Sequence, residues 1–166
     1  MGYRMIIIKI WYHIWAIVKK FFYKIIYRKK IEIAKNVTWR RDFSIMVGKN
    51  GKLQIEKDCF FNNGCTIGVN KSVVIEKGSI FGENVKIYDH NHKFADITKS
   101  IKSQGYSNGM VRIGQHCWIG SNVCILKNAD IGNNCVIGAG CVISGKIEDN
   151  TIVRANNQYI LETLKQ

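Results

Sequence analysis

A branched aliphatic or aromatic residue that recurs every six positions most constrains the fold of this 166-residue chain. The longest unbroken run is Ile113, Ile119, Ile125, Ile131, Ile137 and Ile143. An earlier block repeats the spacing with Ile55, Phe61 and Ile67, then Ile75, Phe81 and Ile87. An α-helix does not fit, because 3.6 residues per turn would scatter these side chains around its axis. The period predicts short extended strands that turn corners and stack around a shared core.

The residues between the ladder positions fit the corners of such coils. Gly120-Ser121-Asn122 and Gly132-Asn133-Asn134 contain residue types that accept turn conformations at low cost. Five of the six cysteines share one register, four positions after a ladder residue: Cys59, Cys65, Cys117, Cys135 and Cys141. Without a CxxC pair, these cysteines are predicted to be reduced core residues, which favours a cytoplasmic location.

The positive charge is concentrated at the N-terminus. Residues 1–30 contain eight bases and no acid, out of a net charge of +13. A nucleic-acid-binding protein would more often spread its bases over a folded face, so no nucleic-acid partner is expected. The charge instead indicates an attachment segment.

Helical spacing in this segment predicts a basic amphipathic helix. Lys9, His13, Lys20, Lys24 and Arg28 form one polar stripe, and apolar residues cover most of the remainder. This pattern is typical of a helix that lies on a membrane surface, here expected at the inner, cytoplasmic face of the membrane. The alternative is a helix that packs on the end of the β-helix or between subunits and covers an open edge.

The ladder is interrupted once at length, between Ile87 and Ile113. If the coil keeps an eighteen-residue period, about eight residues are extra and leave as a loop within residues 88–111. Long excursions on a rigid scaffold are frequent functional sites. His90 and His92 stand at the root of this one.

The hexad pattern over residues 37–153 resembles the hexapeptide-repeat acyltransferases. The resemblance implies an all-β, left-handed parallel β-helix with an N-terminal amphipathic α-helix and one long excursion loop. The expected boundaries are residues 1–34 for the helix, 35–153 for the catalytic β-helix and 154–166 for a tail.

The string from Val85 to His92 resembles the maltose and galactoside O-acetyltransferase branch, and also its relatives that modify capsule or lipopolysaccharide. This resemblance assigns the catalytic base to His92, with His90 as the rival and Asp89 as a group that orients one of the two imidazoles. Such a base is needed because an alcohol is a poor nucleophile at neutral pH, whereas a neutral imidazole can accept its proton.

The same resemblance implies an acetyl-CoA co-substrate held between subunits of a homotrimer. Its expected contacts are Trp118 and Gly120 of a Trp-Ile-Gly element, with Gly138 and Asn156. Trp118 could instead pack between adjacent subunits. The two glycines are expected at corners of the coils, and they would contact the coenzyme only through their proximity to it.

Acceptor-binding roles are implied for Asn63 or its neighbour Asn62, and for Tyr88. Asparagines at such corners can equally serve only to make turns.

These features predict an O-acetyltransferase that moves an acetyl group from acetyl-CoA to a hydroxyl of a surface-polysaccharide or lipid-linked glycan precursor. The alternatives are an amino-sugar N-acetyltransferase, a non-catalytic assembly module, and a metal-dependent hydratase resembling the β-helical carbonic anhydrases. A hydratase would need His90, His92 and His116 as metal ligands. No metal is expected for the leading hypothesis.

Overall fold

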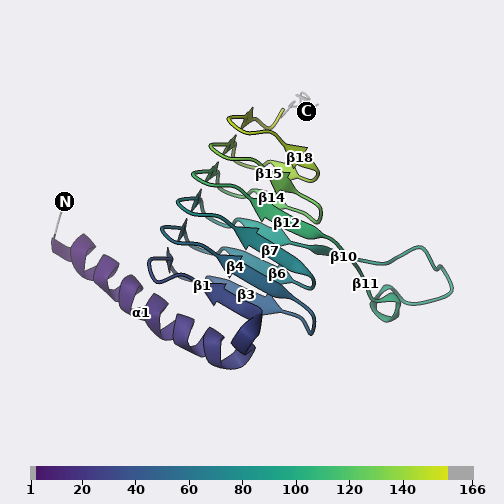
Figure 1. Ribbon diagram of the computed structural model, residues 1–166, viewed down its shortest axis with the longest axis horizontal. Coiled ribbons are helices and arrows are strands. Elements are labelled where there is room, and N and C mark those ends of the chain that lie inside the picture. The colour runs from purple at the N-terminus through teal and green to yellow at the C-terminus, as the bar shows by residue number, and fades with distance from the viewer. Residues whose placement is uncertain (1–2, 157–166) are drawn as a thin grey trace, which may run out of the picture.

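Short parallel strands wind into a three-faced β-helix in the computed structural model, which describes residues 3–156 (Figure 1). The first face stacks β1 (Ile31–Ile33), β4 (Lys52–Ile55), β7 (Ser72–Ile75), β12 (Met110–Ile113), β15 (Asp130–Ile131) and β18 (Lys146–Ile147). The second face stacks β2 (Thr38–Trp39), β5 (Phe60–Phe61), β8 (Ile80–Phe81), β13 (Trp118–Ile119), β16 (Val136–Ile137) and β19 (Ile152–Val153). The third face stacks β3 (Ser44–Val47), β6 (Thr66–Val69), β9 (Lys86–Tyr88), β14 (Cys124–Ile125) and β17 (Val142–Ile143). The predicted left-handed parallel β-helix is confirmed.

The six-residue ladder forms the core of the β-helix. Each ladder residue pairs in register with its equivalent on the next coil, as Ile87 does with Ile67 below and Ile125 above. These side chains are almost fully buried, and the second face replaces the aliphatics with aromatics in its lower coils. There Phe61 stacks on Phe81 with ring centroids 4.4 Å apart. The core is therefore continuous from coil to coil, as the repeat predicts.

Asparagine and glycine have different roles at the corners, although the sequence pattern predicted a turn role for both. Asn122 and Asn134 adopt left-handed backbone conformations, with φ of 59° and 54°. Gly120 is not left-handed, but a Cβ there would lie 2.6 Å from the amide nitrogen of Ala139 on the next coil. The asparagines thus make the turn, whereas Gly120 permits the coils to approach.

The cysteine prediction is confirmed for the shared register. Its five members, Cys59, Cys65, Cys117, Cys135 and Cys141, are buried and not disulfide-bonded, whereas Cys124 is half-buried. They act as small core side chains.

Helix α1 (Tyr3–Tyr27), followed by the short helix η1 (Arg28–Lys30), packs on the lowest coil (Figure 1). Ala16 is buried there, and Lys20 Nζ donates a hydrogen bond of 2.6 Å to the carbonyl oxygen of Lys35. Because β1 already pairs with β4, the β-helix begins at Ile31 rather than at the predicted residue 35. None of the helices within residues 3–156 is long and apolar enough to cross a membrane.

The excursion leaves the corner between the third and first faces, after Tyr88, and returns at Met110. On the coil below, eight positions separate Ile67 from Ile75, whereas twenty-six separate Ile87 from Ile113, so the excursion adds eighteen residues. The predicted figure of about eight is wrong, because Ile87 and Ile113 lie on successive faces and not on the same face of successive coils. The base of the excursion is an antiparallel pair, β10 (His90–His92) with β11 (Tyr106–Asn108), and its tip carries η2 (Ile101–Gln104).

Candidate active site

Asp89 is the most tightly held residue at the root of the excursion. Its side chain is fully buried. One carboxylate oxygen accepts a hydrogen bond from the amide of Asn70 at 2.7 Å, and the other accepts from Lys71 and Ser72 at 2.7 and 2.8 Å. Three backbone donors satisfy a buried carboxylate and fix its orientation. The site is thus anchored on the coil below.

The oxygen of Asp89 that accepts from Asn70 also lies 2.9 Å from Nδ1 of His90. A carboxylate can only accept, so this contact requires the proton on Nδ1 and leaves Nε2 of the neutral ring as the acceptor. The sequence left open which imidazole Asp89 orients, and the structure pairs it with His90.

The His90 ring is also held by aromatic neighbours. Tyr106 of β11 packs edge-on at a centroid distance of 5.1 Å, and Tyr88 does so at 6.2 Å. All three line a pocket of about 340 Å³ that also includes Tyr27 at the end of α1. Tyr88, a predicted acceptor contact, therefore shares a cavity with a candidate base. Tyr106 was not predicted, because its approach depends on how the excursion folds back.

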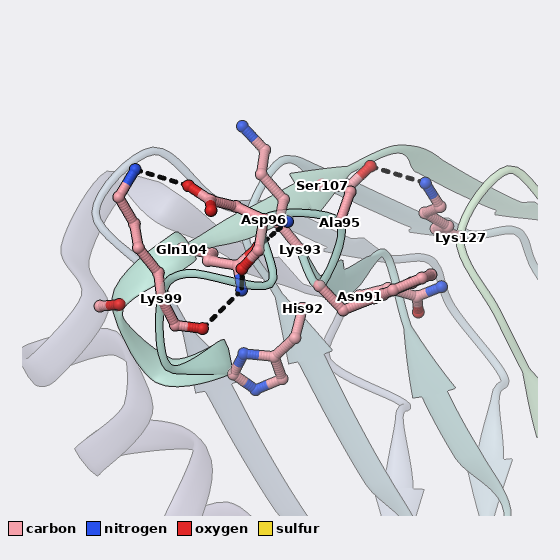
Figure 2. Close-up of a pocket in the computed structure, with 11 residues that line it drawn as sticks. Asn91, His92, Lys93, Ala95, Asp96, Lys99, Gln104, Ser107 and Lys127 are labelled. Carbon is pink, nitrogen blue, oxygen red and sulfur yellow. Dashed lines mark hydrogen bonds and ion pairs between the residues drawn. The ribbon is translucent and has the colours of Figure 1, made fainter.

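His92 also packs against Tyr106, with ring centroids 4.6 Å apart. It is exposed and lines a larger cleft of about 580 Å³ that the excursion itself forms, together with Lys127 (Figure 2). At one edge of this cleft, Lys127 Nζ donates a hydrogen bond of 2.7 Å to the hydroxyl of Ser107 (Figure 2). Two imidazoles therefore contact one tyrosine, and each borders a different cavity.

The excursion around this cleft is ordered by its own side chains. Gln104 Nε2 donates hydrogen bonds to the carbonyl oxygens of Asp96 and Lys99, at 3.0 and 3.2 Å (Figure 2). Lys99 also forms an ion pair of 2.7 Å with the Asp96 carboxylate. These bonds give the excursion a defined shape without a hydrophobic core of its own.

The predicted donor contacts do not meet His90 within one chain. Trp118 lies on the second face, opposite the corner that carries His90, and is 56% exposed. Gly120 and Gly138 directly follow β13 and β16 of that face, and the exposed Asn156 comes three residues after β19. The part of the predicted tail beyond Asn156 lies outside the described residues.

The predicted acceptor asparagines are engaged in corner bonds. Asn62 Oδ1 accepts from Arg40 at 3.2 Å, and Asn63 Nδ2 donates to Glu83 at 3.1 Å. Both lie at the corner between the second and third faces, away from the excursion. In one chain they serve as corner residues rather than as neighbours of His90.

The histidines do not form a metal centre. His116 occupies a different corner, in a left-handed conformation beside Gly78, and not the root of the excursion. Within the part of the chain that the structure describes, no three His, Cys, Asp or Glu side chains are grouped to hold a metal ion. The arrangement gives no support to the hydratase alternative.

Comparisons with known proteins extend this picture. Residues 110–145 match the bacterial transferase hexapeptide (six repeats) family. A probable acetyltransferase of Mycobacterium tuberculosis is 33% identical over 118 residues, which cover 71% of this chain but 37% of that protein. The chain thus spans well under half of this curated relative.

Two solved structures share the fold. The first is a hexapeptide-repeat acetyltransferase from Vibrio cholerae complexed with acetyl coenzyme A. It has a TM-score of 0.64 and 21% identity, and the match covers 82% of this chain and 72% of that one. The second, a maltose O-acetyltransferase from Clostridium difficile, has a TM-score of 0.55 and 25% identity over 86% of this chain and 75% of its own.

Proposed function

The chain belongs to the hexapeptide-repeat acyltransferase family, and from this premise we propose that it is an acetyl-CoA-dependent O-acetyltransferase. The proposed acceptor is a hydroxyl of a surface-polysaccharide or lipid-linked glycan precursor. The observation that carries the proposal is the contact between buried Asp89 and His90 at the root of the excursion. The likeness to the maltose O-acetyltransferase supports the choice of a sugar hydroxyl. The buried reduced thiols, together with the acetyl-CoA requirement, support a cytoplasmic site of action.

We assign the general base to His90 rather than to His92, the residue that the sequence resemblance favoured. Asp89 fixes the tautomer of His90 that has an acceptor at Nε2, and no other hydrogen bond to this ring occurs within residues 3–156. His92 has no comparable carboxylate partner among the same residues. A carboxylate behind an imidazole both orients the ring and stabilises its protonated form.

The chemistry follows from this arrangement. Acetyl-CoA supplies an activated thioester carbonyl. Nε2 of His90 takes the proton from the acceptor hydroxyl as the oxygen attacks, and Asp89 stabilises the resulting imidazolium. The imidazolium then returns the proton to the departing sulfur, so His90 ends the cycle neutral.

A complete site requires more than one copy of the chain. His90 follows β9 at the corner between the third and first faces, whereas Trp118 lies in β13 on the second face of the next coil, so we propose that Trp118 assists from a neighbouring subunit. The second face carries an outward column of apolar side chains, in which Ile80, Trp118 and Ile152 are 45%, 56% and 60% exposed. We propose a homotrimer in which this column covers the acetyl-CoA arm beside a neighbour's His90. An exposed apolar column is suited to such an interface.

The pocket at His90 supports a sugar acceptor. Tyr88 and Tyr106 both pack against the imidazole and line the same pocket, and an aromatic ring offers an apolar surface with a polar hydroxyl at its edge. A sugar ring has the matching combination of C–H faces and hydroxyl edges. The polar cleft beside His92 is open to the remainder of a longer glycan.

The test is release of free thiol from acetyl-CoA in the presence of candidate glycan acceptors. His90→Ala is expected to lower kcat by about 10²- to 10⁴-fold, whereas the matched variant His92→Ala keeps most of the activity. The opposite ranking would transfer the role to His92. Normal turnover in both variants would exclude a histidine base.

The product distinguishes O-acetylation from N-acetylation. An acetyl ester is cleaved by mild alkali, whereas an acetamide is stable. An alkali-stable product made with an amino-sugar acceptor would replace the proposed reaction with N-acetylation.

A further inference from the structure

The outward face of α1 is a long apolar surface that no other segment of residues 3–156 covers. Its side chains are each about half or more exposed: Ile10, Trp11, Ile14, Trp15, Ile17, Phe21, Phe22, Ile25 and Ile26. Trp11 stacks on Trp15 at a centroid distance of 6.3 Å. Soluble monomers rarely expose so large a contiguous apolar patch unless it binds something.

Two lysines and a tyrosine of the helix bond to the β-helix instead. Lys19 Nζ donates a hydrogen bond of 3.3 Å to the carbonyl oxygen of Phe43, and Lys20 Nζ donates to Lys35. The hydroxyl of Tyr27 donates to the carbonyl oxygen of Ile45 at 3.1 Å. These bonds satisfy backbone groups at the open end of the β-helix. The two middle lysines of the basic segment thus cap the protein, which leaves the opposite face apolar.

The charge beside this face has one sign. Lys24 in the last turn of α1 is exposed, as are Arg28 and Lys29 in η1, and the sequence contains no acid before Glu32. Two copies of this helix would bring like charges together, whereas a negatively charged surface complements them. Apolar aromatic and aliphatic side chains bordered by bases are suited to an anionic lipid surface.

We propose that the outward face of α1 docks on the surface of an anionic bilayer, with its Trp, Phe and Ile side chains at the boundary of the acyl chains. Figure 1 shows the helix beneath the lowest coil, with its N-terminal half running past the strands, so a flat surface can reach its full length. The β-helix then stands above the lipid surface on its capped end.

Docking also determines where the candidate active site lies. Tyr27, in the last turn of α1, lines the same pocket as His90, together with Met46, which is 56% exposed. The His90 pocket therefore opens close to the docking helix. The consequence, which rests on the proposed acetyl transfer, is an acceptor carried on a membrane lipid.

Sedimentation of the full-length protein with vesicles tests the docking. We expect binding to phosphatidylglycerol–phosphatidylcholine vesicles, weaker binding to pure phosphatidylcholine, and a further decrease at high salt. The triple variant Trp11→Ser, Phe21→Ser, Ile25→Ser should lower the partition coefficient about tenfold or more. The matched control Phe94→Ser, Ile97→Ser, Ile101→Ser removes three apolar side chains of the excursion that are at least as exposed, and it should bind like the native chain.

The outcomes separate the possible occupants of this face. A native chain that stays in the supernatant with anionic vesicles, or a triple variant that binds as well as the native chain, overturns the proposal. If the triple variant instead lowers the mass measured by light scattering without lipid, a second copy covers the face and the lipid proposal is wrong. Thermal unfolding should be unchanged, because the three substituted side chains point away from the β-helix.

Activity on a soluble glycan is measured separately from vesicle binding. The triple variant should keep this activity but no longer bind the vesicles. Absence of acetyl transfer with every acceptor would refute the proposed function, yet it would leave the docking result intact.

Discussion

The Asp89 carboxylate lies 2.9 Å from Nδ1 of His90, and it is held there by backbone amides from a different coil. The two residues are adjacent in sequence, but the contact depends on Asn70, Lys71 and Ser72, which precede Asp89 by up to nineteen positions. The stack of coils therefore fixes the carboxylate, and the carboxylate fixes the imidazole. His90 is held by the scaffold rather than by the excursion alone.

Asp89→Asn is expected to disturb both the tautomer of His90 and the fold of the corner. The amide nitrogen must replace one of two oxygens that both accept hydrogen bonds, so a donor will face a donor in either orientation. We expect kcat to fall by about 10²-fold or more with a smaller change in KM, and the free energy of unfolding to fall by about 1–3 kcal/mol.

Nitrogen NMR of the His90 ring separates positioning from simple destabilisation. The native chain should show the proton on Nδ1, and Asp89→Asn should raise the fraction with the proton on Nε2. Asp58→Asn is a matched control, because Asp58 is exposed at a left-handed corner that Asn adopts readily. An unchanged tautomer together with native kcat would contradict the role assigned to Asp89.

Tyr106 is expected to act through its ring, because that ring packs against both His90 and His92, at 5.1 and 4.6 Å between centroids. Tyr106→Phe keeps this packing and should retain most activity. Tyr106→Ala frees both imidazoles and should lower kcat/KM by about tenfold, or roughly 1.4 kcal/mol. Steady-state kinetics of the two variants give the comparison. A larger loss in the Phe variant would show that the hydroxyl matters more than the ring.

The aromatic stack of the lower coils should dominate the stability of that end of the molecule. Phe61 is fully buried between Phe43 and Phe81, at centroid distances of 4.9 and 4.4 Å. Phe61→Ala should therefore lower the free energy of unfolding by about 3–5 kcal/mol, measured by denaturant titration. Its neighbour Phe60 is only half-buried on the outer side of the strand, so Phe60→Ala should cost about 1 kcal/mol. Equal losses would contradict the inward register of the ladder.

The repeat made much of the fold predictable, because each coil places its own ladder residue inward by local spacing. Ile119 and Ile137 are buried as the period requires, and the cysteine register follows from the same rule. Asn122 was also predictable as a turn residue, since few side chains accept a left-handed backbone.

The features of the site that could not be predicted from the sequence depend on contacts between residues far apart in the chain. The partners of Asp89 lie on the coil below, and Tyr106 reaches His90 only because β11 folds back on β10. The contact of Lys19 with the β-helix could not be predicted either. A helical wheel shows which residues share a stripe, but it does not show which surface that stripe faces. The resemblance favoured His92 from the spacing of the aligned residues alone. That spacing does not show which imidazole the Asp89 carboxylate contacts.

Alkaline pH should weaken the fold through its buried thiols. Burial raises the pKa of the Cys59 thiol to about 11 from its ordinary value of 9.0, because a thiolate would be desolvated among core side chains. A pKa that is higher in the folded state means that the folded chain binds the thiol proton more tightly. The resulting stability is fully present below pH 9 and is lost as the pH rises through 11.

Denaturant titrations from pH 8 to 11 should show a steeper fall in the free energy of unfolding for the native chain than for Cys59→Ala, by up to about 2–3 kcal/mol. Since Cys59→Ala removes the titrating group but keeps a small apolar side chain, parallel pH profiles would contradict this assignment.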